Sequence, residues 1–266
     1  MTQSLIDIGA NLAHDGFDGD RAAMMQRAAD AGVQTMIVTG SSDDSNVIAA
    51  ELAGRSDGRL YSTAGIHPHH ASDYSDESDA TIRRLIQQEA VVAVGECGLD
   101  YFRNLSPREA QLDAFKRQLD IAKDSAMPVF LHQRDAHEDF IAVLKPYLSD
   151  LSRAVAHCFT GDAKSLREYV ELGLYIGITG WICDERRGKQ LYDIVSMIPD
   201  ERLMVETDAP YLLPRTIRPK PKSRRNEPMH LPEIVRVVAE ARGQTEQHVA
   251  EITHANSMRF FNLSAD

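Results

Sequence analysis

The chain has 266 residues, 43% of them hydrophobic, which suits one large domain or two small ones with a substantial core. Its formal net charge is −11, from 29 basic and 40 acidic residues. This balance argues against a protein that coats nucleic acid non-specifically, because such coating needs a basic field. It does not exclude an enzyme that acts on nucleic acid, since a bound metal ion can reverse the local sign of the charge.

Cysteine usage and hydropathy indicate the compartment. Cys97, Cys158 and Cys183 are widely separated and form no CxxC pair, which fits a reducing environment better than a disulfide framework. The chain opens without a basic-then-apolar leader, and no apolar run approaches about 18 residues. We therefore expect a cytoplasmic protein without a signal peptide, a membrane span or an obligate protein partner.

Short β-branched runs alternate with amphipathic stretches along the chain. The predicted strands span residues 4–9, 34–40, 60–67, 91–96, 128–132, 154–157, 174–179 and 202–208. Helical patterns at 21–32, 106–126 and 165–173 lie between them. Ser106 and Pro107 are predicted to be the N-cap and the first helical residue of the second of these helices.

This alternation predicts the fold class. Near-continuous apolar strands separated by helices are typical of a parallel sheet covered on both faces. Eight such units in roughly 250 residues match the size of a (β/α)8 TIM barrel. The alternative is an open doubly wound sheet, but no glycine-rich dinucleotide or phosphate-binding loop follows any strand. Without a linker, repeat or low-complexity segment, residues 1–266 are expected to form a single α/β domain.

Ionisable side chains stand at the C-terminal ends of six predicted strands, where barrel enzymes carry their catalytic groups. They are Asp7, His67, Glu96, His132, His157 and Asp208. This mixture of imidazoles and carboxylates is typical of a divalent cation site for Mg²⁺, Mn²⁺ or Zn²⁺. We interpret Glu96, His132 and His157 as metal ligands. Asp208 is either a further ligand or the general base for an attacking water.

The remaining polar residues near these ends have alternative interpretations. His67 is expected either to contact substrate as part of the catalytic site or to belong to a turn with Pro68. Glu206 is either a direct catalytic participant or a carboxylate that supports the ligands from behind. For Asp7 a structural or supporting role is favoured over metal ligation, and Asn11 is expected to line the site or cap the turn.

Two loops next to these strand ends carry aromatic and basic residues. The loop after 174–179 brings Trp181 together with Arg186 and Arg187. The loop after 202–208 is punctuated by prolines and too irregular for a helix, and its basic residues are Arg215, Arg218, Lys220, Lys222, Arg224 and Arg225. A charge run is ordinarily a solvated surface, but a long irregular loop in a compact domain is usually functional. We expect phosphate contacts from these loops, with Trp181 and Tyr211 stacking on bases.

Seven segments, in this order, resemble the TatD family of metal-dependent deoxyribonucleases: AGIHPHH, AVGECGLDY, VFLHQRDAHEDF, AHCFTG, YIGITGWICDERRG, ETDAPYLLPR and SRRNEPMHLP. The resemblance implies a TIM-barrel, metal-dependent hydrolase that acts as a 3′→5′ exonuclease on single-stranded DNA and RNA. It also implies magnesium as the working cofactor and a role in DNA repair or degradation.

The same resemblance assigns roles to individual residues. Glu96, His132 and His157 match the family's metal ligands, Asp208 its catalytic aspartate, and His67 and Arg134 positions that line the substrate site. Many relatives open with an H-x-H pair where this chain has Asp7 and Asn11. We therefore expect one firmly held metal ion, with any second ion bound only weakly near Asp7 and Asn11.

Two other functions remain open from the sequence. A small-molecule hydrolase on the same barrel would use a similar metal set, although it would not need the basic segment 215–225. A non-catalytic binding protein with a vestigial site is the third interpretation, and it would not need to retain a divalent ion.

Overall fold

The computed structural model describes residues 4–263, and it has the predicted (β/α)8 TIM-barrel architecture. The sheet has eight strands in the order β1 to β8, and the strand pairs described in it are parallel. The strands are β1 (Leu5–Ala10), β2 (Val33–Val38), β3 (Leu60–Ala64), β4 (Val91–Asp100), β5 (Val129–Arg134), β6 (Ala154–Ala156), β7 (Tyr175–Ile178) and β8 (Leu203–Val205).

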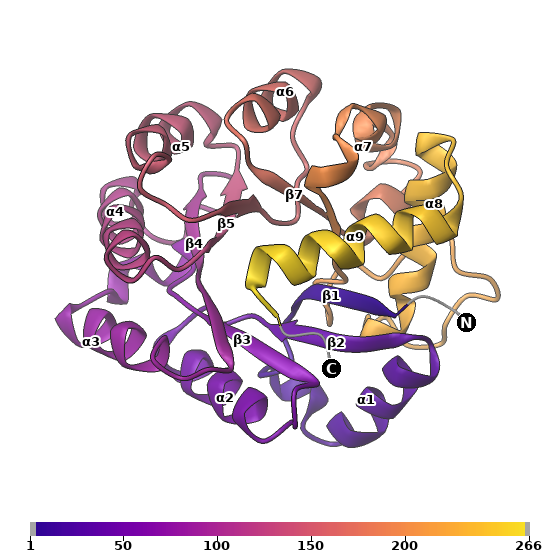
Figure 1. Ribbon diagram of the computed structural model, residues 1–266, viewed down its shortest axis with the longest axis horizontal. Helices are drawn as coiled ribbons and strands as arrows, with labels where there is room; N and C mark the ends of the chain where they lie inside the picture. Colours follow the sequence, from indigo (N-terminus) through magenta and orange to yellow (C-terminus); the bar gives the residue numbers. More distant parts are fainter. Residues whose placement is uncertain (1–3, 264–266) are drawn as a thin grey trace. The chain divides into compact units, whose positions relative to one another are not determined.

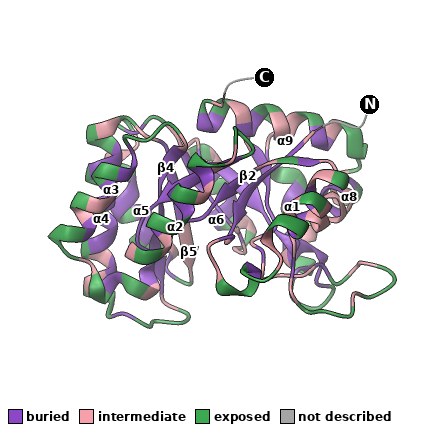
Figure 2. Ribbon diagram, turned by 90° about the horizontal axis from the view of Figure 1, so that it is seen from below, coloured by how far each residue is buried: buried purple, intermediate pink, exposed green. Residues whose placement is uncertain are grey.

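The helices follow the strands in alternation, as Figure 1 shows. They are α1 (Arg21–Asp30), α2 (Asp43–Gly54), α3 (Asp76–Leu85), α4 (Arg108–Ser125), α5 (His137–Leu144), α6 (Ala163–Glu171), α7 (Lys189–Ile194), α8 (Leu231–Arg242) and α9 (Glu246–Phe261). Figure 2 shows that buried residues concentrate in the strands, whereas the helices are exposed on one side. Among residues 4–263, no helix combines the length and apolar character needed to span a membrane.

The chain divides by its internal contacts into two compact units. Unit 1 takes in the described residues of 1–37, 158–171 and 175–266, and unit 2 takes in residues 38–157 and 172–174. The expectation of a single domain stays a prediction.

Two buried glutamines of α4 hold the C-terminal ends of β3 and β4 in unit 2. Gln118 accepts a hydrogen bond from the backbone N–H of Ile66 and donates one to its carbonyl, at 2.7 and 3.1 Å. Gln111 makes the same pair of contacts with the backbone of Asp100, at 2.8 and 3.2 Å. Both side chains are fully buried, so these bonds satisfy backbone groups that no strand partner reaches.

In unit 1, β1 and β8 are joined beyond the regular ladder. The backbone N–H of Asp208 donates to Gly9, and that of Asn11 donates to Ala209, at 2.8 and 2.7 Å. The C-terminal helix α9 packs against both strands and runs alongside β1 in Figure 1. This region carries the residues expected at the first and last strand ends.

Several predicted boundaries are wrong. β3 ends at Ala64, because Pro68 begins a short 3-10 helix, η2 (Pro68–Asp73), and His67 is its N-cap. β4 continues to Asp100, so Glu96 lies within the strand and not at its end. β8 ends at Val205, which leaves Glu206 and Asp208 in the segment that follows.

The predicted cap of α4 is also wrong, because the N-cap is Pro107 and the helix begins at Arg108. The Ser106 hydroxyl instead accepts from the N–H of Ser72 and donates to the carbonyl of His69. By contrast, the prediction of an irregular loop after the last strand is confirmed, since residues 206–227 contain no helix.

Gly98 allows β4 to approach β5 closely. Its φ is +142°, and a Cβ atom added there would collide with the carbonyl oxygen of His132. Gly98→Ala is therefore expected to lower the free energy of unfolding by at least about 2 kcal/mol, because both the backbone conformation and the strand spacing must change. Urea unfolding followed by circular dichroism measures the loss.

Gly54→Ala is the matched control. Gly54 lies in the last turn of α2, and a Cβ atom there would meet no heavy atom within 4 Å. This control should leave stability unchanged or raise it by up to about 1 kcal/mol. Equal effects of the two substitutions would contradict the close-approach argument.

Candidate metal centre

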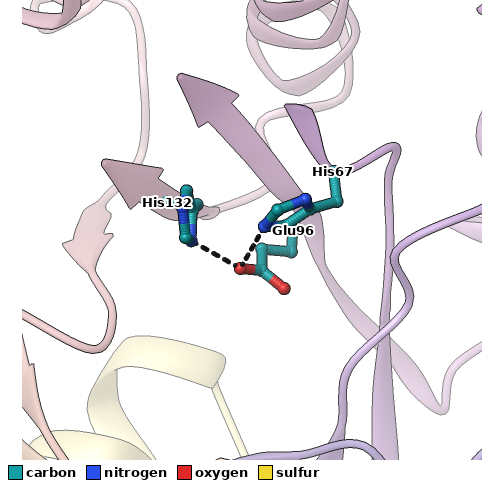
Figure 3. Close-up of side chains that lie close together, drawn as sticks. All are labelled: His67, Glu96 and His132. Atoms are coloured by element: carbon teal, nitrogen blue, oxygen red, sulfur yellow. Dashed lines mark ion pairs between the residues drawn. The ribbon is translucent and has the colours of Figure 1, made fainter. Parts of the chain in front are cut away.

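Unit 2 brings together four of the sequence-predicted residues around one carboxylate oxygen. Glu96 Oε1 lies 2.7 Å from His157 Nε2, 3.0 Å from His132 Nδ1 and 3.4 Å from His67 Nε2. Figure 3 shows the imidazoles of His67, from the segment after β3, and His132, from β5, directed at the same oxygen of Glu96.

Burial sets the electrostatics of this cluster. Burial raises the pKa of Glu96, but the imidazoles of His157, His67 and His132 outweigh it and hold that pKa well below its usual range. Burial also lowers the pKa of His67 well below that of a free histidine, and it outweighs the opposing effect of the Glu96 carboxylate, which raises that pKa. For His132 the carboxylates of Asp100 and Glu96 outweigh burial and raise the pKa. The cluster is thus an ionised carboxylate surrounded by ring nitrogens.

The donor set fits a divalent cation. Ligand atoms of His67, Glu96 and His132 all lie within 4.8 Å of one another, and His157 reaches the same carboxylate oxygen. Ions such as Zn²⁺ and Mg²⁺ bind imidazole or carboxylate donors at about 2.0–2.2 Å, so donors separated by about 3–4 Å can share one ion.

His67 differs from the other imidazoles in its hydrogen bonding. Its Nδ1 accepts a hydrogen bond from the backbone N–H of His69 at 3.0 Å. A neutral imidazole that accepts at Nδ1 carries its proton on Nε2, and Nε2 is the atom that faces Glu96. A protonated ring nitrogen donates a hydrogen bond but does not ligate a metal ion. His132 Nδ1 and His157 Nε2 face the same ionised carboxylate at 3.0 and 2.7 Å, so this argument applies to them equally. The ligand set of Glu96, His132 and His157 and the substrate-contacting role of His67 stay predictions.

Asp100 is a member of the site that the sequence interpretation missed. Its carboxylate accepts from His69 Nε2 at 2.8 Å and from the N–H of Arg103 at 2.7 Å, and it lies 3.4 Å from His132 Nε2. Burial raises its pKa, but the His132 and His69 rings outweigh that effect and hold the pKa well below the usual range. Asp100 shares the strand parity of Glu96 on β4, and this spacing of four residues was the available signal.

Unit 1 brings Asp208 together with Asn11. Asn11 Nδ2 donates to Asp208 Oδ1 at 2.9 Å, which fixes the orientation of that carboxylate. Asp208 has a φ of +54°, a left-handed conformation that non-glycine residues adopt mainly where the surrounding structure requires it. Asn11 therefore lines the turn as expected, and its amide is directed at the predicted catalytic aspartate.

Asp7 and Glu206 are both fully buried in unit 1. The Asp7 carboxylate accepts from the hydroxyl of Thr207 at 2.5 Å, from its N–H at 2.9 Å and from the N–H of Gly9 at 3.3 Å. Burial outweighs these bonds and raises the pKa of Asp7 to about 7. Glu206 accepts from the N–H of Cys158 at 2.5 Å. The partners of Asp7 favour its structural interpretation, as a link between β1 and the segment after β8.

The predicted substrate-binding cations of unit 1 have different surroundings. The Arg187 guanidinium lies 4.6 Å from the centroid of the Trp181 ring and pairs with Asp184 at 2.9 Å. Arg225 pairs with Asp20 and Glu227 at 2.8 and 2.7 Å, so it anchors the end of its loop. Arg186 and Arg224 are exposed.

Asp100→Asn is expected to weaken divalent metal binding by about 10- to 100-fold, because the carboxylate orients the His132 ring that faces Glu96. Titration of the purified protein with Mn²⁺, followed by isothermal calorimetry and by electron paramagnetic resonance of the free ion, measures the Kd. Asp150→Asn, at a surface ion pair with Lys123, is the control. An unchanged Kd in a folded Asp100→Asn variant would contradict this role.

Asp7→Asn should alter how stability depends on pH. The pKa of Asp7 is about 7 in the folded chain and about 3.9 in an unfolded one, so folding favours the protonated form. As pH rises from about 4 to about 7, the wild type should lose up to about 4 kcal/mol of unfolding free energy relative to Asp7→Asn, and the difference should then level off. Urea unfolding of both proteins across this range measures it, and a pH-independent difference would contradict the raised pKa.

Comparisons with known proteins identify the family. The family model described as TatD related DNase matches residues 6–262. The 3′-5′ ssDNA/RNA exonuclease TatD of Erwinia billingiae (strain Eb661) is 51% identical over 261 residues, which are 98% of this chain and all of the relative. The protein of the same name from Cronobacter sakazakii (strain ATCC BAA-894) is also 51% identical, over 98% of this chain and 99% of the relative.

Solved structures agree with this assignment. YJJV, a TatD homolog from Escherichia coli K12, superposes with a TM-score of 0.90 at 31% identity, covering 99% of this chain and 100% of that one. A TatD family hydrolase from Entamoeba histolytica gives a TM-score of 0.88 at 26% identity, again over 99% and 100%. With its barrel, its cluster of His and Glu side chains that could hold a metal ion, and its match over nearly the full length, the chain belongs to the TatD-related DNase family.

Proposed function

We infer that the protein is a metal-dependent hydrolase that acts as a 3′→5′ exonuclease on single-stranded DNA and RNA and releases 5′-nucleotides. The observation that carries this inference is the convergence of His132 and His157 on the buried Glu96. It occurs in a chain 51% identical to proteins named 3′-5′ ssDNA/RNA exonuclease TatD. Removal of damaged DNA ends in the cytoplasm is the setting that we propose.

Glu96, His132 and His157 would hold the cofactor, which we propose to be Mg²⁺, with Mn²⁺ or Zn²⁺ as alternatives. When bound, such an ion polarises the scissile phosphate and lowers the pKa of a water molecule. We propose that Asp7 and Asn11 hold at most a weak second ion. The Asp7 carboxylate already accepts a hydrogen bond from Thr207, and the Asn11 amide already donates one to Asp208.

The chain's own residues supply the remaining chemistry in this proposal. His67 donates from Nε2 to a phosphate oxygen, and Arg134 binds the terminal nucleotide. Asp208 takes the proton from the attacking water, with Asn11 holding the carboxylate in one orientation. Glu206 supports this region from its buried position, while Trp181, Arg186, Arg187, Arg224 and Arg225 contact the more distant strand.

The test is digestion of single-stranded oligonucleotides labelled at either end, with Mg²⁺ and with EDTA. Stepwise loss of nucleotides from the 3′ end is expected, and EDTA should abolish it. Absence of cleavage with every divalent ion would overturn the proposal and favour the small-molecule hydrolase. Retention of no metal after dialysis, together with unchanged properties of His132→Ala, would favour a binding protein.

Asp208→Asn should keep the fold and lower the rate of nucleotide release by at least about 100-fold, since a neutral amide cannot take up the water proton. Asp193→Asn, at an exposed pair with Lys189, is the control and should retain the wild-type rate. Near-wild-type turnover of Asp208→Asn would remove this residue from the mechanism.

A further inference from the structure

An exposed aromatic residue lies on the loop that leads from β4, the strand of Glu96, to α4 (Figure 1). Phe102 is 55% exposed and Leu105 on the same loop is 67% exposed. Isolated exposed apolar side chains need no explanation. This pair follows directly on Asp100, which contacts His132 and His69.

The loop is held in a defined shape. The Asp100 carboxylate accepts from the N–H of Arg103, and its carbonyl accepts from the N–H of Asn104, at 2.7 and 3.2 Å. The N–H of Tyr101 donates to the carbonyl of Arg134 at 2.9 Å. Phe102 lies between these fixed residues, so its exposure is a property of an ordered turn.

Arg134 connects the aromatic ring to the metal centre. Its guanidinium carbon lies 4.3 Å from the centroid of the Phe102 ring, a distance typical of a cation–π contact. On β5, Arg134 follows His132 by two residues, so both side chains leave the same side of the strand. The strand advances about 6.6 Å over these two residues, roughly the reach of a single nucleotide.

This combination suits a nucleobase. A guanidinium plane and an aromatic ring together offer stacking and positive charge, which every base with its adjoining phosphate can use regardless of sequence. Arg103 is exposed on the same loop and adds positive charge. Two apolar side chains offer too little surface for a stable protein interface.

We propose that Phe102, with the Arg134 guanidinium, forms a stacking platform for one unpaired base near the 3′ end of the substrate. This assignment rests on the proposed exonuclease function and deepens it. A base inside a duplex is stacked on both faces and held by its pairing partner, so the platform favours an unpaired strand whose base can be turned onto it. Phe102 thereby becomes a determinant of substrate specificity.

The test compares Phe102→Ala and Phe102→Trp with the control Ile48→Ala, which removes a 44% exposed side chain from α2. Binding of a fluorescent single-stranded oligonucleotide is measured by anisotropy in EDTA, where no hydrolysis occurs. Phe102→Ala should raise the Kd about tenfold or more, whereas Phe102→Trp and Ile48→Ala should stay near wild type. With Mg²⁺, Phe102→Ala should raise KM more than it lowers kcat.

Oligonucleotides with one abasic residue at each of the last three positions locate the base. At one position the wild type should lose as much affinity as Phe102→Ala loses on the intact strand, and Phe102→Ala should lose nothing further there. An unchanged Kd for Phe102→Ala on the intact strand would overturn the platform. So would an abasic substitution that weakens binding of Phe102→Ala as much as binding of the wild type at each of the three positions. A wild type that binds single strands but never cleaves them would overturn the proposed function alone, while one that binds no single strand would overturn both.

Discussion

One ionised carboxylate buried in unit 2, that of Glu96, is the constraint on which the candidate site depends. Glu96 is 6% exposed, and His67, His132 and His157 face the same oxygen atom. A buried charge is costly unless it is paired or coordinated, so each neighbouring ring has to be held in place by other elements. Much of the polar architecture around β3, β4 and β5 serves this purpose.

The supporting contacts fall into two groups. Gln118 of α4 binds the backbone of Ile66 just before His67, and Gln111 binds the backbone of Asp100 at the end of β4. Gly98 lets β4 approach β5, and Asp100 then reaches the rings of His69 and His132. Such outer partners usually determine ligand orientation. The exposed Phe102 follows from the same arrangement, because the turn after Asp100 holds it outside the core.

In unit 1, polar contacts at the end of β1 hold the segment that follows β8. At this position the chain carries Asp7 and Asn11. Asp7 is satisfied by the hydroxyl and N–H of Thr207, and Asn11 donates to Asp208. Both side chains therefore hold the segment after β8 to β1. Asn11 thereby orients the carboxylate of Asp208, and the expectation of a single firmly held ion stays a prediction.

The sequence by itself determined the barrel and most of the candidate site's cluster of His and Glu side chains. Alternating apolar runs specify parallel strands, and Glu96, His132 and His157 are recognisable because three consecutive strands each carry a ligand-type residue. It did not determine where the strands end, since Pro68 begins a 3-10 helix after β3 and distant contacts, such as those of the α4 glutamines, bind the backbone near those ends. Only the tertiary structure revealed the contacts of Asp100, the hydrogen bond that His67 Nδ1 accepts and the exposure of Phe102. These depend on atoms brought together across the fold. Strand periodicity places Asp100 on the same side of β4 as Glu96, but it does not specify which side chains Asp100 contacts.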